Sequence, residues 1–155
     1  SYIEPYASSS FEAAAFLRRC GANITQVRKM FRDDMASYQA KAEIISSVEV
    51  YQEKFAIARG ENLDIESPTI VGAQAANDLL DINAVKASFV LTNYNGRIYI
   101  SARSIDEVNV QIIMERLGGG GHMNASGAQF EHTDMERAVE DLKKVIDEMV
   151  EGGDI

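Results

Sequence analysis

The sequence predicts an α/β (α+β) fold with a mixed sheet of about five strands, flanked by helices and preceded by a helical segment. Apolar residues recur at helical spacing through the first 46 residues, whereas short runs of strand character begin near Ser47. Helical stretches then separate several of these runs, which is typical of crossovers between strands. Asn95-Gly96 joins two of the runs directly, as in an antiparallel hairpin. Hairpins and helical crossovers together indicate a mixed sheet rather than a parallel one.

Helices are predicted to fill most of the first 46 residues, after an irregular start. An Ala-rich helix spans Phe11–Cys20 and ends at Gly21. Asn23 and Gln26 form a capping-box-like start to a second helix. A third helix spans Met35–Ser46. Its apolar residues at helical spacing are Tyr38, Ala42 and Ile45.

From Ser47 onward, strands alternate with helices. The predicted strands are Val48–Tyr51, Phe55–Ala58, Val85–Thr92, Arg97–Ala102 and Ala128–Phe130. The predicted helices are one that begins at Pro68, one over Asp106–Leu117, and one from a capping box at Thr133 and Glu136 through Val150. Arg59–Glu66 is predicted to be a polar loop. The residues of the last helix predicted to face the core are Val139, Leu142, Val145, Ile146 and Met149. We therefore divide the chain into a helical segment, residues 1–46, and a mixed domain, residues 47–155.

The charge balance limits the classes of partner. The 155 residues include 24 Asp and Glu against 15 Lys and Arg, which gives a formal net charge of −9. Because phosphate contacts supply most of the affinity for long DNA or RNA, this balance argues against a long nucleic acid as partner. A small anionic ligand held by one or two arginines is compatible with it, and so is a partner domain that carries metal ions.

Cysteine content and hydropathy indicate the compartment. The single cysteine, Cys20, excludes a disulfide framework and indicates a reducing, cytosolic environment. The chain has no run of about 18 apolar residues, so this stretch is not expected to span a membrane. Because it begins at Ser1 rather than Met, we expect a piece of a longer protein, and anchoring elements could lie outside it.

The segment from Gly118 to Gly127 has the strongest chemical signature, because four glycines follow a predicted helix and lead into His122 and Asn124. Glycine lets the backbone adopt positive φ angles and approach a ligand, and successive N–H groups can form an anion-binding concavity. A short helical turn is expected to begin near His122 and to point its N-terminus at the same place. The residues of this segment predicted to bind a phosphate are Gly119, Gly120, Gly121, His122 and Asn124. The alternative interpretation is a flexible linker.

Arg103 and Ser104 are further candidates. Arg103 ends a predicted strand, where α/β sheets bind ligands, and arginine can grip a phosphate bidentately. Alternatively, Arg103 is a solvated arginine at the end of the strand, and Ser104 is a helix cap. The sequence shows no nucleophile–base pair and no cluster with metal-ligand spacing, so no catalytic and no metal-binding residue is predicted.

Gly118–Gly127 resembles the glycine–histidine signature of the DHH-associated domain, type 1, which follows the catalytic DHH domain in many phosphoesterases. Other segments are similar to the GdpP-type cyclic-di-AMP phosphodiesterases, which are membrane-anchored proteins of Gram-positive bacteria. These segments are Tyr2–Ser9, Ala87–Val90 and Ile100–Ser104. The resemblance covers nearly the whole chain. It implies that residues 1–46 are the remnant of a DHH domain and linker, and that residues 47–155 are the substrate-binding domain.

The resemblance also implies an activity for the whole enzyme, namely hydrolysis of cyclic-di-AMP to the linear dinucleotide pApA, with manganese ions (Mn²⁺) in the DHH domain. It places His122, the adjacent glycines and Arg103 on the substrate. The implied partners are cyclic-di-AMP and the DHH domain of the same polypeptide, a homodimer is left open, and the implied location is the cytoplasmic face of the cell membrane. The Asp-His-His motif is absent, and the stretch between Ser9 and Phe11 is shortened relative to the family. This chain is therefore expected to be inactive by itself.

Three alternatives remain open. A nuclease of the DHH superfamily would act on short oligonucleotides such as nanoRNA or single-stranded DNA. A non-catalytic nucleotide-binding or dimerising module would use the glycine segment for structure alone. The editing-associated domain of alanyl-tRNA synthetase-like proteins shares the glycine–histidine loop, but no cysteine/histidine editing site accompanies the loop here.

Overall fold

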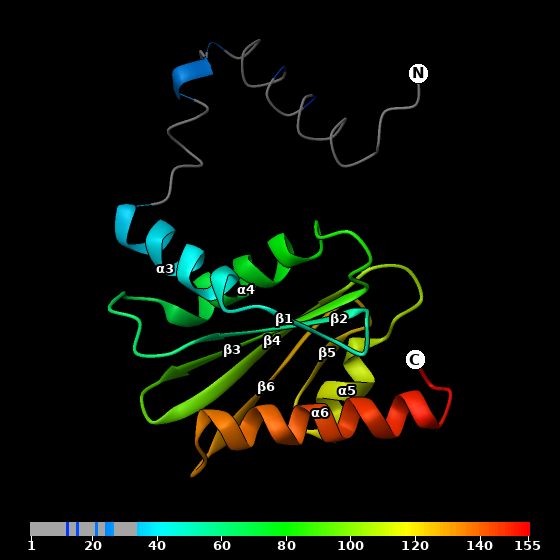
Figure 1. The fold of residues 1–155 in the computed structure, drawn as a ribbon. Helices are drawn as coiled ribbons and strands as arrows, with labels where there is room; N and C mark the ends of the chain where they lie inside the picture. The colour runs from blue at the N-terminus through cyan, green and yellow to red at the C-terminus, as the bar shows by residue number, and fades with distance from the viewer. Residues whose placement is uncertain (1–11, 13–14, 16–20, 22–23, 27–33) are drawn as a thin grey trace. The chain divides into compact units, whose positions relative to one another are not determined.

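The computed structural model describes residues 12, 15, 21, 24–26 and 34–155 of the chain (Figure 1). The chain divides into two compact units, residues 1–34 and residues 35–155, which are considered separately. In the first unit, residues 24–26 are helical. The predicted helix over Phe11–Cys20 and the predicted helix start at Asn23 lie largely outside the described residues.

A six-stranded mixed sheet forms the centre of the second unit, with strand order β1-β2-β3-β4-β6-β5. The strands are β1 (Glu49–Tyr51), β2 (Phe55–Gly60), β3 (Ala87–Tyr94), β4 (Arg97–Ser104), β5 (Gly120–His122) and β6 (Ala125–Glu131). β2 and β3 run parallel, and every other neighbouring pair is antiparallel. The predicted mixed α/β fold is confirmed, and the additional strand β5 comes from the glycine-rich segment.

Helices lie on both faces of this sheet (Figure 1). α3 (Met35–Ser46) and α4 (Pro68–Leu79) lie on one face, and α5 (Val110–Arg116) and α6 (Met135–Glu151) lie on the other. α4 connects the parallel strands β2 and β3, which need a crossover of this kind. It packs against β2, β3 and β4, so the part of that face formed by β6 and β5 lies beyond it.

Two apolar cores, one on each face, hold the layers together. β4 shows how the sequence divides its residues between them, because successive side chains of a strand point to opposite faces. Ile98, Ile100 and Ala102 are buried in the core under α5 and α6. The residues that alternate with them are Tyr99, Ser101 and Arg103, all half-buried on the α4 face.

Several helix boundaries differ from those predicted. α5 begins at Val110 rather than Asp106, because the side chain of Asn109 accepts hydrogen bonds from the N–H groups of Gln111 and Ile112. The α6 cap is Asp134 rather than Thr133, since the Asp134 carboxylate accepts from the N–H of Arg137 at 2.8 Å.

Two smaller differences concern the region before α4. Strand β2 continues to Gly60, so Arg59 lies in a strand and not in the predicted loop. α3 has the predicted bounds, but it buries Ala40 and Ile44 and leaves Tyr38 61% exposed. The helical spacing was therefore right for the element but did not identify the face that packs on the sheet.

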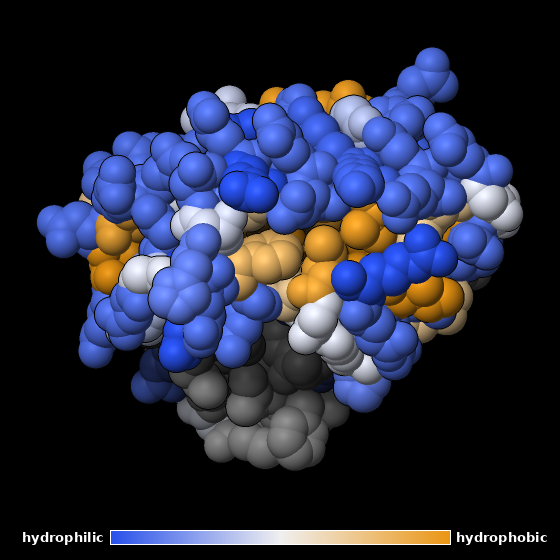
Figure 2. Space-filling model, turned by 90° about the horizontal axis from the view of Figure 1, so that it is seen from below, coloured by the Kyte–Doolittle hydropathy of each residue, from blue (hydrophilic) through white to orange (hydrophobic). Residues whose placement is uncertain are grey.

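The surface on the α6 side is mostly hydrophilic and is crossed by a band of hydrophobic residues (Figure 2). Partly buried hydrophobic residues packed against the core of this layer are Tyr51, Leu117, Phe130, Val145, Val150 and Ile155. In α6 itself, the predicted inward residues Val139, Leu142, Ile146 and Met149 are buried, and Val145 is partly buried. The amphipathic pattern of the last helix therefore predicted its buried face correctly.

Candidate functional site

The first two glycines of the glycine-rich segment end helix α5. Gly118, with φ of 85°, donates its N–H to the carbonyl of Glu115, and Gly119 donates its N–H to the carbonyl of Met114. This pair of hydrogen bonds around a left-handed residue is a Schellman motif. Because both N–H groups bond to the helix, neither remains free for an anion.

The remaining glycines form strand β5 of a tight hairpin. Gly120–His122 pairs with Ala125–Gly127 of β6, and residues 123 and 124 form the turn. The short helical turn predicted near His122 is therefore wrong, because the backbone of this segment is satisfied by strand pairing instead. β5 is at the edge of the sheet, so alternate N–H groups of β5 face away from β6.

Close packing of the chain explains why glycine occupies two of these positions. A Cβ at Gly119 would lie 2.1 Å from the carbonyl oxygen of Gly127, and a Cβ at Gly121 would lie 2.6 Å from the Cα of Ser126. Gly120 differs, because a Cβ there would meet nothing within 4 Å. Gly119 and Gly121 are therefore needed for packing, whereas Gly120 opens onto free space.

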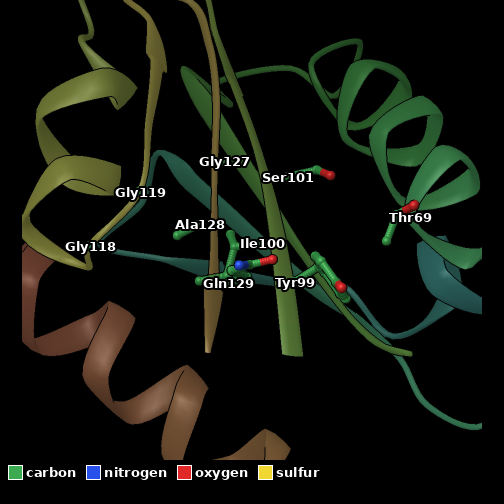
Figure 3. Close-up of a pocket in the computed structure, with 9 residues that line it drawn as sticks. All are labelled: Thr69, Tyr99, Ile100, Ser101, Gly118, Gly119, Gly127, Ala128 and Gln129. Atoms are coloured by element: carbon green, nitrogen blue, oxygen red, sulfur yellow. The ribbon is translucent and has the colours of Figure 1, made fainter. Parts of the chain in front are cut away.

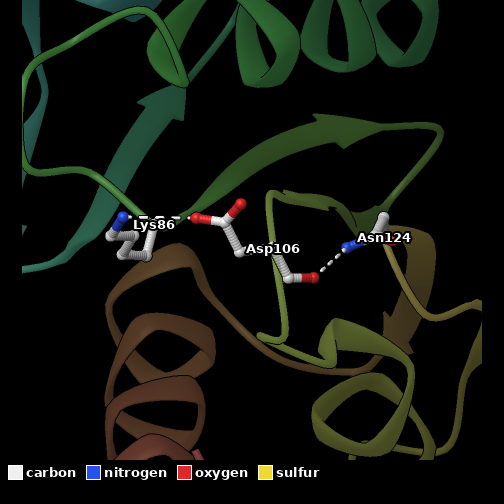
Figure 4. A network of polar contacts seen from close by, with 3 residues as sticks. All are labelled: Lys86, Asp106 and Asn124. Atoms are coloured by element: carbon white, nitrogen blue, oxygen red, sulfur yellow. Dashed lines mark hydrogen bonds and ion pairs between the residues drawn. The ribbon is translucent and has the colours of Figure 1, made fainter.

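A set of hydrogen bonds fixes the hairpin tip to the connection between β4 and α5. The Asn124 amide donates to the Ser104 hydroxyl at 3.0 Å and to the carbonyl of Asp106 at 3.4 Å. Figure 4 shows the second of these contacts, beside the ion pair of Lys86 with Asp106. Ser104 is buried, and its hydroxyl donates to the carbonyl of Val108 at 2.6 Å. We name this group, Ser104, Asp106 and Asn124, the hairpin latch.

Arg103 and His122 lie in one row across three strands. Ala125 of β6 is paired with Arg103 of β4 on one side and with His122 of β5 on the other. Directly paired residues point to the same face, so both side chains lie on the α4 face with only the methyl group of Ala125 between them. Two strand spacings separate their Cα atoms by about 10 Å.

Arg103 has no acidic partner within the described part of the chain. Its Nη1 donates to the carbonyl of Ala102 at 2.8 Å, and burial lowers the pKa of its guanidinium from the ordinary value. Because arginine stays protonated at neutral pH, this half-buried cation can accept an anionic ligand. His122 is exposed beside the open edge of the sheet.

A shallow depression of about 420 Å³ lies on the same face (Figure 3). It is next to the row of Arg103 and His122, because its lining residues Ser101 and Gly127 lie two positions along their strands from Arg103 and Ala125. The residues that line it are Thr69, Tyr99, Ile100, Ser101, Gly118, Gly119, Gly127, Ala128 and Gln129. Thr69 comes from the first turn of α4, and the Ser101 hydroxyl points towards that helix. We name the row of Arg103, Ala125 and His122 together with this depression the open face.

The structure places the predicted site residues in three settings. Arg103 and His122 belong to the open face, and Gly120 lies beside them on the same side of the sheet. Ser104 and Asn124 are engaged in the hairpin latch, and Gly119 and Gly121 are needed for packing, although Gly119 also lines the depression. Sequence reasoning missed Thr69, Tyr99 and Gln129. The alternation of polar and apolar residues along β4 could have identified Tyr99, because it places that side chain on the same face as Arg103.

Among the described residues, no group of three or more His, Cys, Asp or Glu side chains could hold a metal ion. No helix in the same part of the chain is long and apolar enough to cross a membrane.

Comparison with known proteins identifies relatives of the chain. The sequence pattern of the DHHA1 domain matches residues 53–152. The chain is 39% identical over 94% of its length to the cyclic-di-AMP phosphodiesterase GdpP of Geobacillus thermodenitrificans, and 40% identical over 94% to that of Bacillus subtilis. It spans 22% of the length of each. An exopolyphosphatase-related protein from Bacteroides fragilis has the same fold, with a TM-score of 0.76, 22% identity, and coverage of 91% of this chain and 43% of its own.

Proposed function

The chain belongs to the DHHA1 domain family, and we propose that it is the substrate-binding C-terminal domain of a manganese-dependent cyclic-di-AMP phosphodiesterase. The names of its relatives in two bacterial species support cyclic-di-AMP as the substrate of the whole protein. The resemblance noted in the sequence further suggests attachment to the cytoplasmic face of a membrane through segments outside this chain.

One observation carries the substrate-binding role, namely the row of Arg103 and His122 on the open face. A cyclic dinucleotide carries phosphodiester anions, for which a guanidinium and an imidazole N–H are suitable donors. Ala125 between the two side chains leaves room for a phosphate, and the absence of an acidic partner among the described residues leaves the Arg103 charge available. The hairpin latch would fix His122 before the ligand arrives, which lowers the entropic cost of binding.

Catalysis is assigned to the DHH domain of the same polypeptide. Bound metal ions would there activate water for attack on the phosphodiester. We also propose that this chain is inactive alone, because its sequence lacks the Asp-His-His motif of the catalytic domain.

Calorimetric titration of cyclic-di-AMP into the chain tests the binding role. His122→Asn and Arg103→Gln should each weaken affinity by roughly ten- to a hundredfold, because both variants carry their N–H donor on a shorter side chain and Arg103→Gln also removes the positive charge. The matched controls are His132→Asn and Arg97→Gln, which alter the other histidine and the arginine at the far end of β4. Equal affinities of the test and control variants would refute the proposed site.

A nuclease acting on short oligonucleotides is the second candidate, because the open face does not enclose its ligand and a linear dinucleotide presents the same groups. Cleavage rates of the whole protein on cyclic-di-AMP and on linear pApA distinguish the two. The proposal predicts that the cyclic substrate is cleaved faster, and a preference for pApA would favour the nuclease.

A further inference from the structure

A second groove, separate from the open face, lies at the end of the sheet where β3 turns into β4. It has a volume of about 310 Å³ and shares no lining residue with the depression on the open face. Its sides are the loop between β2 and α4 and the turn between β3 and β4, which lie at the same end of the sheet (Figure 1). The residues that line it are Asn62, Leu63, Ile65, Pro68, Asn93, Tyr94, Asn95 and Gly96. Arg103 is at the opposite end of β4, so this groove is distinct from the proposed phosphate site.

Two asparagines fix the shape of this groove. Asn62, which has a φ of 53°, donates its N–H to the side-chain oxygen of Asn93 at 3.0 Å. The Asn93 amide donates in return to the side-chain oxygen of Asn62 at 3.5 Å. Leu63 and Ile65 anchor the same loop, because both are partly buried against the core under α3 and α4. The groove is therefore formed before a ligand arrives, which lowers the entropic cost of binding.

The opposite side of the groove presents groups that the described part of the chain does not use. Tyr94 is 40% exposed, and no lysine or arginine of the described residues lies over its ring. The side chain of Asn95 makes no hydrogen bond to another described residue. An amide can both donate to and accept from a peptide backbone, and exposed aromatic rings are enriched where proteins bind one another. This side of the groove therefore suits an extended peptide.

Acidic residues of the loop after β2 indicate the charge of that peptide. They are exposed, and none of them forms an ion pair with another described residue. These residues are Glu61, Asp64 and Glu66. Residues 60–85 include no lysine or arginine, and Arg97, beside the turn, is paired with Glu131 at 3.1 Å. The N-terminus of α4 contributes only about half a positive charge, so the surroundings of the groove remain negative.

We propose that this groove binds an extended basic segment of a partner protein. Apolar side chains of the segment pack between Leu63, Ile65 and the Tyr94 ring, while its backbone bonds to the Asn95 amide. Its lysine or arginine side chains lie near the loop carboxylates, and one of them stacks on Tyr94 as a cation–π contact. This interaction goes beyond the proposed function, because it uses neither Arg103 nor His122.

NMR titration of the isotopically labelled chain with the peptide Lys-Leu-Lys-Pro-Leu-Lys tests the groove, and Glu-Leu-Glu-Pro-Leu-Glu is the matched acidic probe. The proline keeps both peptides extended. The basic peptide should shift the amide signals of residues 61–66 and 93–96, and the acidic peptide should shift none of them. The double variant Asp64→Asn and Glu66→Gln should weaken binding of the basic peptide about three- to tenfold, because it removes two exposed ion pairs.

The matched control is the double variant Glu136→Gln and Asp141→Asn, which removes the same charge from exposed positions of α6. It should leave the affinity for the basic peptide unchanged. If both double variants weaken binding equally, the peptide is held by the overall negative charge alone, and the groove is overturned as its site. Absence of any shift in residues 61–66 and 93–96 would also overturn it. Calorimetric affinity for cyclic-di-AMP should be the same in the parent and in both double variants, so this test is independent of the proposed function.

Discussion

Neighbouring glycines of one short segment have different physical roles. Gly119 lies against the carbonyl of Gly127, whereas Gly120, on the α4 face opposite the same residue, has free space around it. The first is needed for folding. The second matters only if something binds above it.

This difference gives a matched pair of variants. Gly119→Ala should destabilise the fold by about 1–3 kcal/mol or more, because its methyl group overlaps backbone that cannot move away. Gly120→Ala should change stability by less than about 0.5 kcal/mol, yet weaken cyclic-di-AMP binding, since its methyl group projects onto the open face. Chemical denaturation measures the first effect and calorimetry the second. A Gly120→Ala variant that binds as tightly as the parent would show that the ligand does not lie over β5.

Ser104 and Asn124 show how a residue type can suit two roles. A hydroxyl and an amide beside a glycine segment are what a phosphate site needs, and the sequence places both there. In the structure their donors are used within the hairpin latch, which positions the turn after His122. Direct contact of either residue with a ligand stays a prediction.

At the scale of elements, a polar contact between residues far apart in sequence joins β1 to α6. The Tyr51 hydroxyl donates to the Asp147 carboxylate at 2.6 Å, and Gln52 donates to the same group at 2.8 Å. The hydrogen bond to Asp147 raises the pKa of Tyr51, and in return the bonds from Tyr51 and Gln52 lower the pKa of Asp147.

These shifts predict two pH limits for the stabilising contact. Asp147 has a lowered pKa in the folded state, so its contribution is present above the ordinary value of 3.8 and is lost as pH falls through the folded pKa. Tyr51 has a raised pKa, so its contribution is complete below the ordinary value of 10.0 and is lost as pH rises through the folded pKa. The gap in unfolding free energy between the parent and Tyr51→Phe should therefore be largest between these values. Denaturation curves across pH measure it, and a gap independent of pH would contradict the contact.

The elements also show which features the sequence can predict. Local signals located the Asn95-Gly96 hairpin, the proline start of α4 and the amphipathic face of α6, because each depends on neighbouring residues. Strand β5 and the first half of β6 were missed, since Ala125-Ser126-Gly127 has the composition of a loop. Their extended structure comes from pairing with β4, a contact between residues distant in sequence.

At the scale of the whole unit, the sheet is covered unevenly. Under α5 and α6 the core is closed, whereas on the other face α4 stops at β4. Residues 125, 127 and 129 of β6 are half-buried or exposed on that face, while Ser126 and Ala128 between them are buried on the other. Arg103 and His122, which were predicted from the sequence as site residues, both lie in this half of the sheet. The sequence could not show that α4, in the part of the chain that the structure describes, leaves this half of the sheet uncovered. That outcome depends on how the helix packs against the strands.

The net charge of −9 is compatible with an anionic ligand on the uncovered part of the sheet. The overall charge of a protein governs its long-range attraction or repulsion of a ligand, and salt screens this effect beyond a distance of about 10 Å. Binding itself depends on the few groups in direct contact with the ligand. A single arginine without an acidic partner in the described part of the chain provides such a contact.

A crystal structure of the chain with cyclic-di-AMP tests the central claim most directly. The account predicts a phosphate within hydrogen-bond distance of both Arg103 and His122 above Ala125, with the ligand on the α4 face of β4, β6 and β5. A ligand on the face covered by α5 and α6, or at the β1 edge of the sheet, would contradict it.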